Sequence, residues 1–501
     1  MDILYAVVAE YATLGGLAAI VVGTFVGIVI GGLPGLGSVV GITICLPLTF
    51  AMDTGPAFFL LLGVYCGSIY GGSISAILIN TPGTPQSAAT LLDGYPMAQA
   101  GKAGLALGWA TLASVFGGLV SCVILILAAP QLARVAVKFG SIEVFALIAM
   151  AMTCIAAVSV GSMVKGLAGG AFGVMISLVG VDPVNGFPRF DFGIDELESG
   201  FDLIAVVVGL FALSEVLERA SSSEAAIEVV RSVRMRLPGL RECLRRFGGA
   251  MRSALIGSWI GFLPGTGATP AAFISYAVAQ RVSRHRDRFG KGEPDGIIAA
   301  EASNNAVTGA AMIPTLALGV PGDVVTAILL GSFVIHGLTP GVRLMMEHET
   351  LVYALFGALI LVNIVMLILA FPVVRLFGII LRIRERYILV GVVALSLIGT
   401  ASVRGNPFDV FVAAVFGIVG FILRRSGFPL APVVIGLVLG PLLEDNLRRG
   451  LLLTKGSFLA FFTHSWIAAV LFAITAALLF APFAISRLSR PAGRARAAAG
   501  P

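Results

Sequence analysis

Charged residues are scarce in this sequence, and their scarcity is the first constraint on the class of protein. Only 12% of the 501 residues are charged and 58% are hydrophobic, whereas soluble domains have about 25% charged and about 45–50% apolar residues. A soluble chain of this composition would expose large hydrophobic patches. Because a bilayer accepts apolar surface on every side of a helix, the composition predicts an integral membrane protein.

The sequence also lacks the alternation of apolar and polar residues that is typical of membrane β-barrel strands. It contains instead long uncharged apolar runs, among them 103–129, 350–371 and 465–485. Each run is long enough to cross about 30 Å of hydrocarbon as a helix. We therefore expect an all-α integral membrane protein with about 10–14 transmembrane or re-entrant helices.

Residues that support enzymatic chemistry are few. The five cysteines are scattered singly without a C-x-x-C pair, and the four histidines form no H-E-x-x-H motif. The Gly-Lys pairs at 101–102 and 290–291 lack the remaining residues of a phosphate-binding loop. No carboxylate pair or nucleophile–base pair is evident for an intramembrane hydrolase. These absences predict a protein that is not an enzyme, with no cofactor and no metal site.

Basic residues are missing from the first 101 positions and concentrated in 219–252, and a second basic loop follows at 281–291. Because they lie beside apolar runs, the net charge of +6 indicates membrane topology rather than nucleic-acid binding. The predicted organisation is a first membrane half at 1–218, a basic cytoplasmic linker at 219–252, a second half with additional spans at 253–486, and a basic, disordered tail at 487–501.

The segment 253–280 separates two basic loops and is only long enough for one span, which would place the loops on opposite sides of the membrane. That arrangement conflicts with the positive-inside bias. The conflict disappears if the segment enters and returns through the Pro-Gly turn at 263–267, where Pro ends a helix and Gly permits a reversal. The alternative is a single kinked span.

The same turn motif occurs twice. Residues 31–37 read GGLPGLG and residues 261–267 read GFLPGTG, with five of seven positions identical. Each is followed by a second Pro-Gly segment, at 80–84 and at 319–323. Two such pairs in the same order predict an internal duplication. Since the first copy has acidic or neutral flanks and the second has basic flanks, we expect inverted repeats, as in many secondary transporters.

The broken helices are the first candidates for a binding site. Non-helical backbone at membrane depth is costly unless it lines a cavity or is buried in protein, and the free N–H groups of a half-helix attract anions while the opposing carbonyls can bind Na⁺. The alternative is that the glycines only pack helices together. The predicted substrate-binding residues are Gly35, Gly37, Ser38, Ser68, Asn80, Thr81, Pro82, Gly83, Thr84, Gly265, Thr266, Gly267, Thr269, Asn304, Asn305, Pro321 and Gly322.

Two acidic residues are candidates for binding a coupling cation. Glu301 precedes the adjacent Asn304 and Asn305, whose amides are expensive in an apolar segment unless they are paired or touch a ligand. Asp323 follows the second Pro-Gly of the second copy. Both acids could instead lie in solvated loops. Asp93 and Glu143 are expected at the membrane interface.

At these motifs the sequence resembles the large membrane subunit of the tripartite tricarboxylate transporters. The residues that carry the resemblance are 32–37, 65–84, 92–96, 261–270, 301–305 and 319–323. The Asp93-Gly94-Tyr95-Pro96 turn and the Lys102-Ala103-Gly104 that follows are the most specific of them. The resemblance covers the chain except for about the last dozen residues.

The resemblance implies a permease for organic carboxylates such as citrate, driven by a cation gradient (Na⁺ or H⁺) without ATP hydrolysis. It also implies two protein partners, a small membrane subunit of about four helices and a periplasmic substrate-binding protein, and a location in the bacterial inner membrane among membrane lipid. Co-transported Na⁺ would be a passenger rather than a cofactor. The alternative function is an ion channel with a Gly-rich, broken-helix filter.

Overall fold

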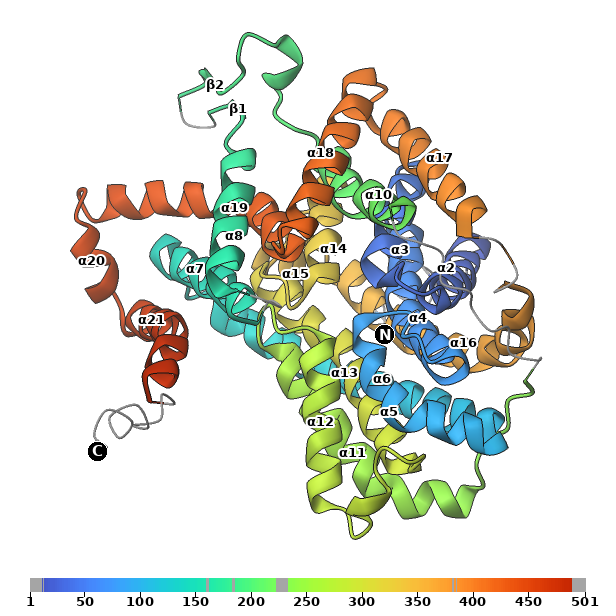
Figure 1. Ribbon diagram of the computed structural model, residues 1–501. Coiled ribbons are helices and arrows are strands. Elements are labelled where there is room, and N and C mark those ends of the chain that lie inside the picture. Colours follow the sequence, from blue (N-terminus) through green and yellow to red (C-terminus); the bar gives the residue numbers. More distant parts are fainter. Residues whose placement is uncertain are drawn as a thin grey trace, which may run out of the picture.

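The computed structural model describes residues 11, 13–158, 162–182, 185–221, 233–380, 383 and 385–488, and the side chains of all of these except 158, 380 and 481–488. The described chain is a bundle of helices (Figure 1). Its one strand pairing is the short antiparallel ladder of β1 (Gly180–Val181) and β2 (Pro188–Arg189). The predicted all-α class is confirmed.

The α-helices described before residue 222 are α2 (Leu14–Gly32), α3 (Gly37–Cys45), α4 (Thr54–Ile79), α5 (Ala88–Met97), α6 (Ala103–Ala136), α7 (Ser141–Val158), α8 (Met163–Ser177), α9 (Leu203–Val207) and α10 (Ser214–Ala220). Those after it are α11 (Leu240–Phe262), α12 (Ala268–Val282), α13 (Pro294–Leu318), α14 (Val324–Ile335), α15 (Val342–Glu347), α16 (Glu349–Ile380), α17 (Glu385–Arg404), α18 (Pro407–Arg425), α19 (Leu430–Leu453), α20 (Phe458–Thr463) and α21 (Trp466–Leu488).

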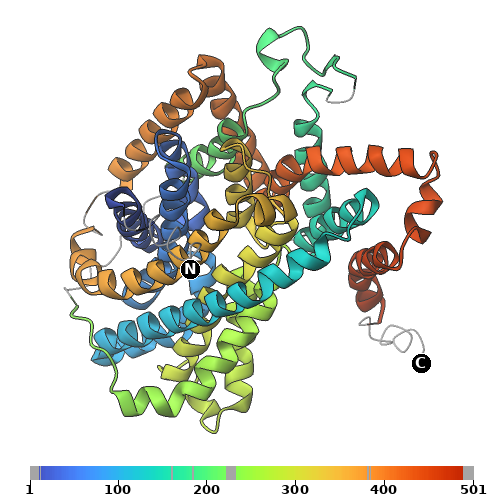
Figure 2. The same cartoon turned by 180° about the vertical axis from the view of Figure 1, so that it is seen from behind.

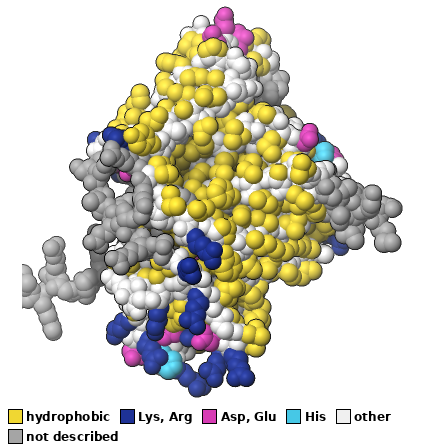
Figure 3. All heavy atoms as spheres, turned by 90° about the vertical axis from the view of Figure 1, so that its right-hand side faces the viewer, with side chains coloured by type: hydrophobic (Ala, Val, Ile, Leu, Met, Phe, Trp, Pro, Cys, Tyr) yellow, Lys and Arg dark blue, Asp and Glu magenta, His cyan; other side chains and the backbone are white. Residues whose placement is uncertain are grey.

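Seven helical stretches of the described chain are long and apolar enough to cross a membrane. They are Leu14–Gly32, Thr54–Ile79, Pro85–Ala136, Glu349–Ile379, Glu385–Arg404, Pro407–Arg425 and Leu430–Leu453. A broad hydrophobic face and a cluster of Lys and Arg side chains at one end of the molecule are visible in Figure 3. The protein is therefore a multi-pass membrane protein.

Helices α4 and α13 form the centre of the bundle. All residues at 57–78 of α4 and at 296–317 of α13 are buried, because most side chains of both helices are apolar or small. Helix α4 packs against α2, and α13 packs against α6 and α11. In contrast, α20 and α21 lie outside the main body, at the end of α19 (Figures 1 and 2).

Rows of glycine allow the central helices to approach each other closely. A Cβ at Gly31 of α2 would lie 2.0 Å from the carbonyl oxygen of Ser68 in α4, and one at Gly27 would lie 2.7 Å from that of Val64. The same arrangement recurs in the second half, where a Cβ at Gly257 of α11 would lie 2.1 Å from the carbonyl oxygen of Ser303 in α13. Small residues are the usual means of close helix contact in membranes.

The glycine row leads to a stability prediction. We expect Gly31→Ala to lower the free energy of unfolding by about 1–3 kcal/mol, because the methyl group must displace backbone of α4. Gly15→Ala is the matched control in the same helix, since a Cβ there meets nothing within 4 Å. Thermal unfolding of both variants in detergent measures the difference; equal midpoints would mean that α2 and α4 do not depend on this contact.

The helix breaks at both Pro-Gly turns. Helix α11 ends at Phe262 and α12 begins at Ala268, and the start of α11 shares a pocket with the end of α12, so the two helices are antiparallel. Helix α3 likewise folds back on α2, with Gly41 beside Ile30. Each turn therefore joins two helices that fold back on each other as a hairpin. That these hairpins enter and leave the membrane on the same side, and that the two copies are inverted, stay predictions.

The basic linker differs in extent from the sequence-based prediction. Residues 222–232 lie outside the described residues, and α11 begins at Leu240, inside the predicted linker 219–252. The arginines of 241–252 therefore belong to the first half of α11. Charge marked them as a loop, but a helix can carry arginines wherever it extends beyond the hydrocarbon region. Of the predicted tail, only 487 and 488 are described, as the end of α21.

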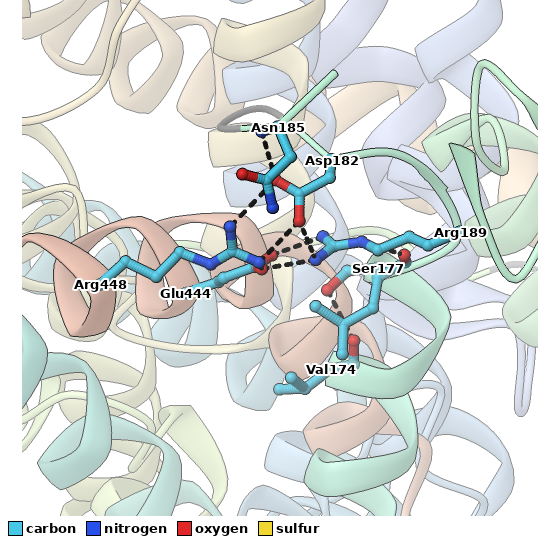
Figure 4. A network of polar contacts seen from close by, with 8 residues as sticks. Val174, Ser177, Asp182, Asn185, Arg189, Glu444 and Arg448 are labelled. Atoms are coloured by element: carbon cyan, nitrogen blue, oxygen red, sulfur yellow. Dashed lines mark hydrogen bonds and ion pairs between the residues drawn. The ribbon is translucent and has the colours of Figure 1, made fainter. Parts of the chain in front are cut away.

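Four charged side chains attach the β1–β2 segment to α19 (Figure 4). Arg189 makes two bonds of 2.6 Å to the carboxylate of Glu444, and Arg448 makes bonds of 2.9 and 2.7 Å to that of Asp182. Arg189 also contacts Asp182 at 3.2 Å. Paired bidentate contacts of this kind fix orientation as well as contributing energy. The network positions the connection between α8 and α9 against α19.

Candidate functional site

A buried polar cluster surrounds Glu301 of α13. Its Oε1 accepts hydrogen bonds from Ser73 of α4 at 2.5 Å and from Thr90 of α5, and its Oε2 accepts one from Ser114 of α6 at 2.8 Å. All four side chains are fully buried. Four helices thus converge on one carboxylate, and among the described residues none of its partners is cationic. The alternative that Glu301 lies in a solvated loop is wrong.

The adjacent asparagines belong to this cluster. Asn304 and Asn305 each donate from Nδ2 to a different oxygen of Glu301 at 3.4 Å, and Asn305 also donates to Asn304 Oδ1 at 2.6 Å. Both are buried, and within the described chain the Oδ1 of Asn305 has no hydrogen-bond partner. A buried amide oxygen without a donor is uncommon in proteins and is available to a cation or a hydroxyl group.

Asp323 lies in a second buried cluster. Its Oδ2 accepts from Tyr65 Oη of α4 at 2.6 Å, and its Oδ1 accepts from the backbone N–H of Thr326 at 2.7 Å and from the Thr326 hydroxyl at 2.9 Å. Asp323 is 8% exposed and Tyr65 is fully buried. Asp323 is therefore the N-cap of α14, and the alternative that it lies in a solvated loop is wrong.

Helix α4 links the two carboxylates. Tyr65, the partner of Asp323, and Ser73, a partner of Glu301, are eight residues apart in that helix. Eight residues correspond to about 12 Å along the helix axis. Acids from the second half of the chain are thus held by hydroxyl groups from the first half, which ties the two halves together at their centre.

The second Pro-Gly segments of the two halves end in the same way. Thr84 and Asp323 each follow Pro-Gly, and the backbone N–H of each donates to the hydroxyl three residues later, of Ser87 at 3.4 Å and of Thr326 at 2.8 Å. In the second half the backbone N–H of Gly265 also donates to the carbonyl of Gly322 at 2.7 Å. This bond joins the two Pro-Gly segments of the second half, both of which contain predicted substrate-binding residues.

Open space remains beside the last glycine of each turn. Gly37 and Gly267 have φ of 67° and 70°, a conformation that favours glycine. A Cβ at Gly37 would meet nothing within 4 Å, and one at Gly267 would meet only the Cβ of Asp323, at 3.7 Å. Both glycines stand where a half-helix begins, α3 and α12, and no side chain caps either helix. The first backbone N–H groups of these helices are the kind that bind anions.

Several of the predicted substrate-binding residues make hydrogen bonds to nearby backbone or end a helix. The hydroxyls of Ser68, Thr81 and Thr266 donate to backbone carbonyls no more than six residues away. Asn80 has φ of 54° and ends α4, and Ser38 accepts a hydrogen bond from Gln86 at 3.2 Å. Four other predicted residues have no side-chain group that could form a hydrogen bond: Gly35, Pro82, Gly83 and Pro321. The hydroxyl of Thr269 forms none in the described chain.

Sequence reasoning missed Thr90, Ser114 and Arg219. The hydroxyl groups of Thr90 and Ser114 could not be recognised as site residues from the sequence, because Ser and Thr in a membrane helix commonly bond to the backbone of their own helix. Arg219 falls in the predicted linker, yet it lies in the last turn of α10, donates to the carbonyl of Pro34 in the first Pro-Gly turn, and forms ion pairs with Glu215 and Glu385. The first turn therefore has a cation beside it that its own sequence lacks.

Asp93, which the sequence predicts at the membrane interface, lies inside the protein rather than on its surface. It is fully buried, and its carboxylate accepts from the backbone N–H groups of Gly292 and Glu293 at 2.9 and 2.8 Å and from Tyr276 at 2.8 Å. Glu143 is also buried, at 5% exposed. Asp93 thus fastens α5 to the loop before α13.

Comparison with known proteins identifies the family. A model of the "Tripartite tricarboxylate transporter TctA family" matches residues 17–435. An uncharacterised 52.8 kDa protein in the TAR-I ttuC′ 3′ region of Agrobacterium vitis is 38% identical over 455 residues, 90% of each chain. An uncharacterised protein in the TAR-II ttuC′ 3′ region of the same organism is 36% identical over 215 residues, 43% of this chain and 89% of that one. No solved structure matches this chain significantly.

Proposed function

Since this chain belongs to the tripartite tricarboxylate transporter TctA family, we propose that it is the large permease subunit of a secondary transporter that imports organic carboxylates, driven by a cation gradient. The family makes it a membrane component of tricarboxylate transport. The observation that carries the proposal is the pair of buried carboxylates, Glu301 and Asp323, each hydrogen-bonded across the two halves of the chain.

The buried carboxylates supply a reason for cation coupling. An isolated ionised carboxylate in an apolar interior is strongly disfavoured and must be neutralised by a proton, a partner or a bound ion. In the described chain Glu301 and Asp323 have hydroxyl and amide partners but no cationic one. We assign the coupling H⁺ or Na⁺ to these acids, with the hydroxyl oxygens and the free Oδ1 of Asn305 as further ligands for Na⁺.

The substrate carboxylate would bind at the turns. The uncapped starts of α3 and α12 offer backbone N–H groups, and the open space at Gly37 and Gly267 allows a ligand to reach them. Substrate at Gly267 would lie beside Asp323, because the Cβ position of Gly267 is 3.7 Å from the Cβ of that residue. This proximity would let the cation at Asp323 and the anionic substrate stabilise each other.

The family also indicates the partners. A tripartite system has other components, and we propose that these are a small membrane subunit and a periplasmic binding protein, with the whole complex in the bacterial inner membrane. Rocking of the two halves about α4 and α13 would expose the site to each side in turn. We propose this motion by analogy with other inverted-repeat transporters.

Uptake by intact cells tests the proposal. Cells carrying this gene with its neighbouring small membrane-subunit and binding-protein genes would receive a panel of labelled carboxylates, citrate included, in Na⁺ and in Na⁺-free buffer. We expect uptake of one carboxylate that requires every gene and collapses with the ion gradient. Uptake of none, with the protein present in the membrane, would overturn the substrate class, and current through the protein alone would favour a channel.

Asp323→Asn separates coupling from folding. Asparagine keeps the cap of α14, since its side-chain oxygen can still accept from the backbone N–H of Thr326, but removes the charge. We expect the cation concentration for half-maximal uptake to rise at least about tenfold, equivalent to the loss of one charged hydrogen bond. Tyr65→Phe is the control that removes the bond and keeps the charge. An unchanged cation response in Asp323→Asn would remove Asp323 from the coupling site.

A further inference from the structure

We propose that an arginine pocket at the start of α11 binds the phosphate headgroup of an anionic phospholipid, whose acyl chain lies in the apolar groove that continues along the same helix. This lipid site is separate from the buried carboxylates and does not depend on which substrate the protein carries. It uses Arg245 and Arg252, which the proposed transport function leaves without a role.

The pocket has a volume of about 140 Å³ and lies between the start of α11, the end of α12 and the start of α13. Arg245, Arg246, Arg252 and Ser253 line one side, and Ser283 lines the other. Arg246 pairs with Glu293 at 3.1 Å and with Asp295, so these three groups together carry one negative charge. Arg245 and Arg252 add two positive charges, which leaves the pocket with a net positive charge.

Several side-chain hydrogen-bond donors that line the pocket have no acceptor in the described chain. Neither Arg245 nor Arg252 forms an ion pair within the described chain. The Nε of Arg252 is buried without a hydrogen-bond partner there, and so is the hydroxyl of Ser253, a residue that is 1% exposed. Buried donors are almost always satisfied in proteins, so these two groups indicate a ligand with acceptor oxygens.

An apolar groove of about 830 Å³ begins where the pocket ends, and Arg252 lines both. Along α11 the groove is lined by Leu255, Trp259 and Leu263, of which Trp259 is 69% exposed. Leu263 follows Arg252 by eleven positions, which corresponds to about 16 Å along a helix. This length is close to half of the about 30 Å hydrocarbon thickness, the depth of one leaflet.

A phospholipid with an anionic headgroup fits both features together. A free anion would fill the pocket and leave the groove exposed, and a neutral lipid would leave the arginine charges unbalanced. Basic pockets between membrane helices are known to hold anionic headgroups. Helices α11 and α12 lie at the lower end of the molecule in Figure 1, and Lys and Arg side chains gather at the lower end in Figure 3. A pocket at that end would lie at headgroup level.

Tryptophan quenching tests the site, because Trp259 is in the groove. The full-length protein would be placed in phosphatidylcholine vesicles containing either brominated phosphatidylglycerol or brominated phosphatidylcholine at the same mole fraction. We expect stronger quenching by the anionic lipid, and we expect Trp259→Phe to remove that excess. Arg245→Gln and Arg252→Gln should each lower the preference for the anionic lipid about fivefold, the effect of one basic residue near a membrane surface.

Arg241→Gln is the matched control, because Arg241 is exposed on the same helix but does not line the pocket. It should leave the preference unchanged; an equal loss in this variant would mean that general surface charge, not the pocket, attracts the lipid. Equal quenching by the two lipids would overturn the proposal, and so would absence of quenching by both, because no acyl chain would then lie beside Trp259. A change in Trp259 emission on adding inorganic phosphate alone would assign the pocket to a free anion instead.

Discussion

Glu301→Gln is expected to lower carboxylate uptake by roughly 10- to 150-fold while the protein still inserts and folds. Loss of one charged hydrogen bond is worth about 1.5–3 kcal/mol, which corresponds to that range. Glutamine has nearly the same shape, but its NH₂ group replaces one acceptor oxygen. Hydroxyls such as that of Ser114 can rotate to accept from it, whereas the Nδ2 groups of Asn304 and Asn305 can only donate.

Glu143→Gln is the matched control for this change. Glu143 is also a buried glutamate, and it accepts from the backbone N–H of Gly140 at 2.9 Å and from Ser465 at 2.5 Å, away from the central cluster. We expect this variant to lose some stability and to keep its uptake per folded molecule. Uptake into vesicles, divided by the amount of folded protein, distinguishes the two sites. Normal uptake by Glu301→Gln would make the Glu301 cluster a structural feature only.

Gly267→Val is expected to abolish uptake without preventing insertion. The valine side chain would occupy the open space at the start of α12, next to Asp323 and the first N–H groups of the helix. The substitution also has a backbone cost of about 1–3 kcal/mol, because valine is disfavoured at φ of 70°. Uptake and thermal unfolding must therefore be measured on the same preparation.

Gly405→Val isolates the backbone cost. Gly405 has φ of 67° and nothing within 4 Å of its Cβ position, and it lies between α17 and α18, outside both turns. We expect a similar loss of stability and near-normal uptake. Gly37→Val, the equivalent change in the first half, should resemble Gly267→Val. If Gly405→Val lost uptake as completely as Gly267→Val, backbone strain rather than a blocked site would be the cause.

The hydrophobic runs and the Pro-Gly turns could be predicted because they depend on local sequence. A helix must be apolar to cross the hydrocarbon region, and a Pro-Gly turn must break it. The breaks at 263–267 and 33–36 are therefore visible in the sequence before any packing is known. That Glu301 and the adjacent asparagines need partners or a ligand could be predicted for the same reason, since the cost of a polar group in an apolar segment is local.

The sequence by itself thus determined a multi-pass helical membrane protein, its family, and two acids that needed partners. Only the tertiary structure decided what those partners are. Ser73, Thr90 and Ser114 are 187–228 residues from Glu301, and Tyr65 is 258 residues from Asp323. A hydroxyl in a membrane helix gives no sign of which distant residue it will meet. That choice is made when glycine rows bring α2 to α4 and α11 to α13, because close backbone contact fixes which side chains face each other.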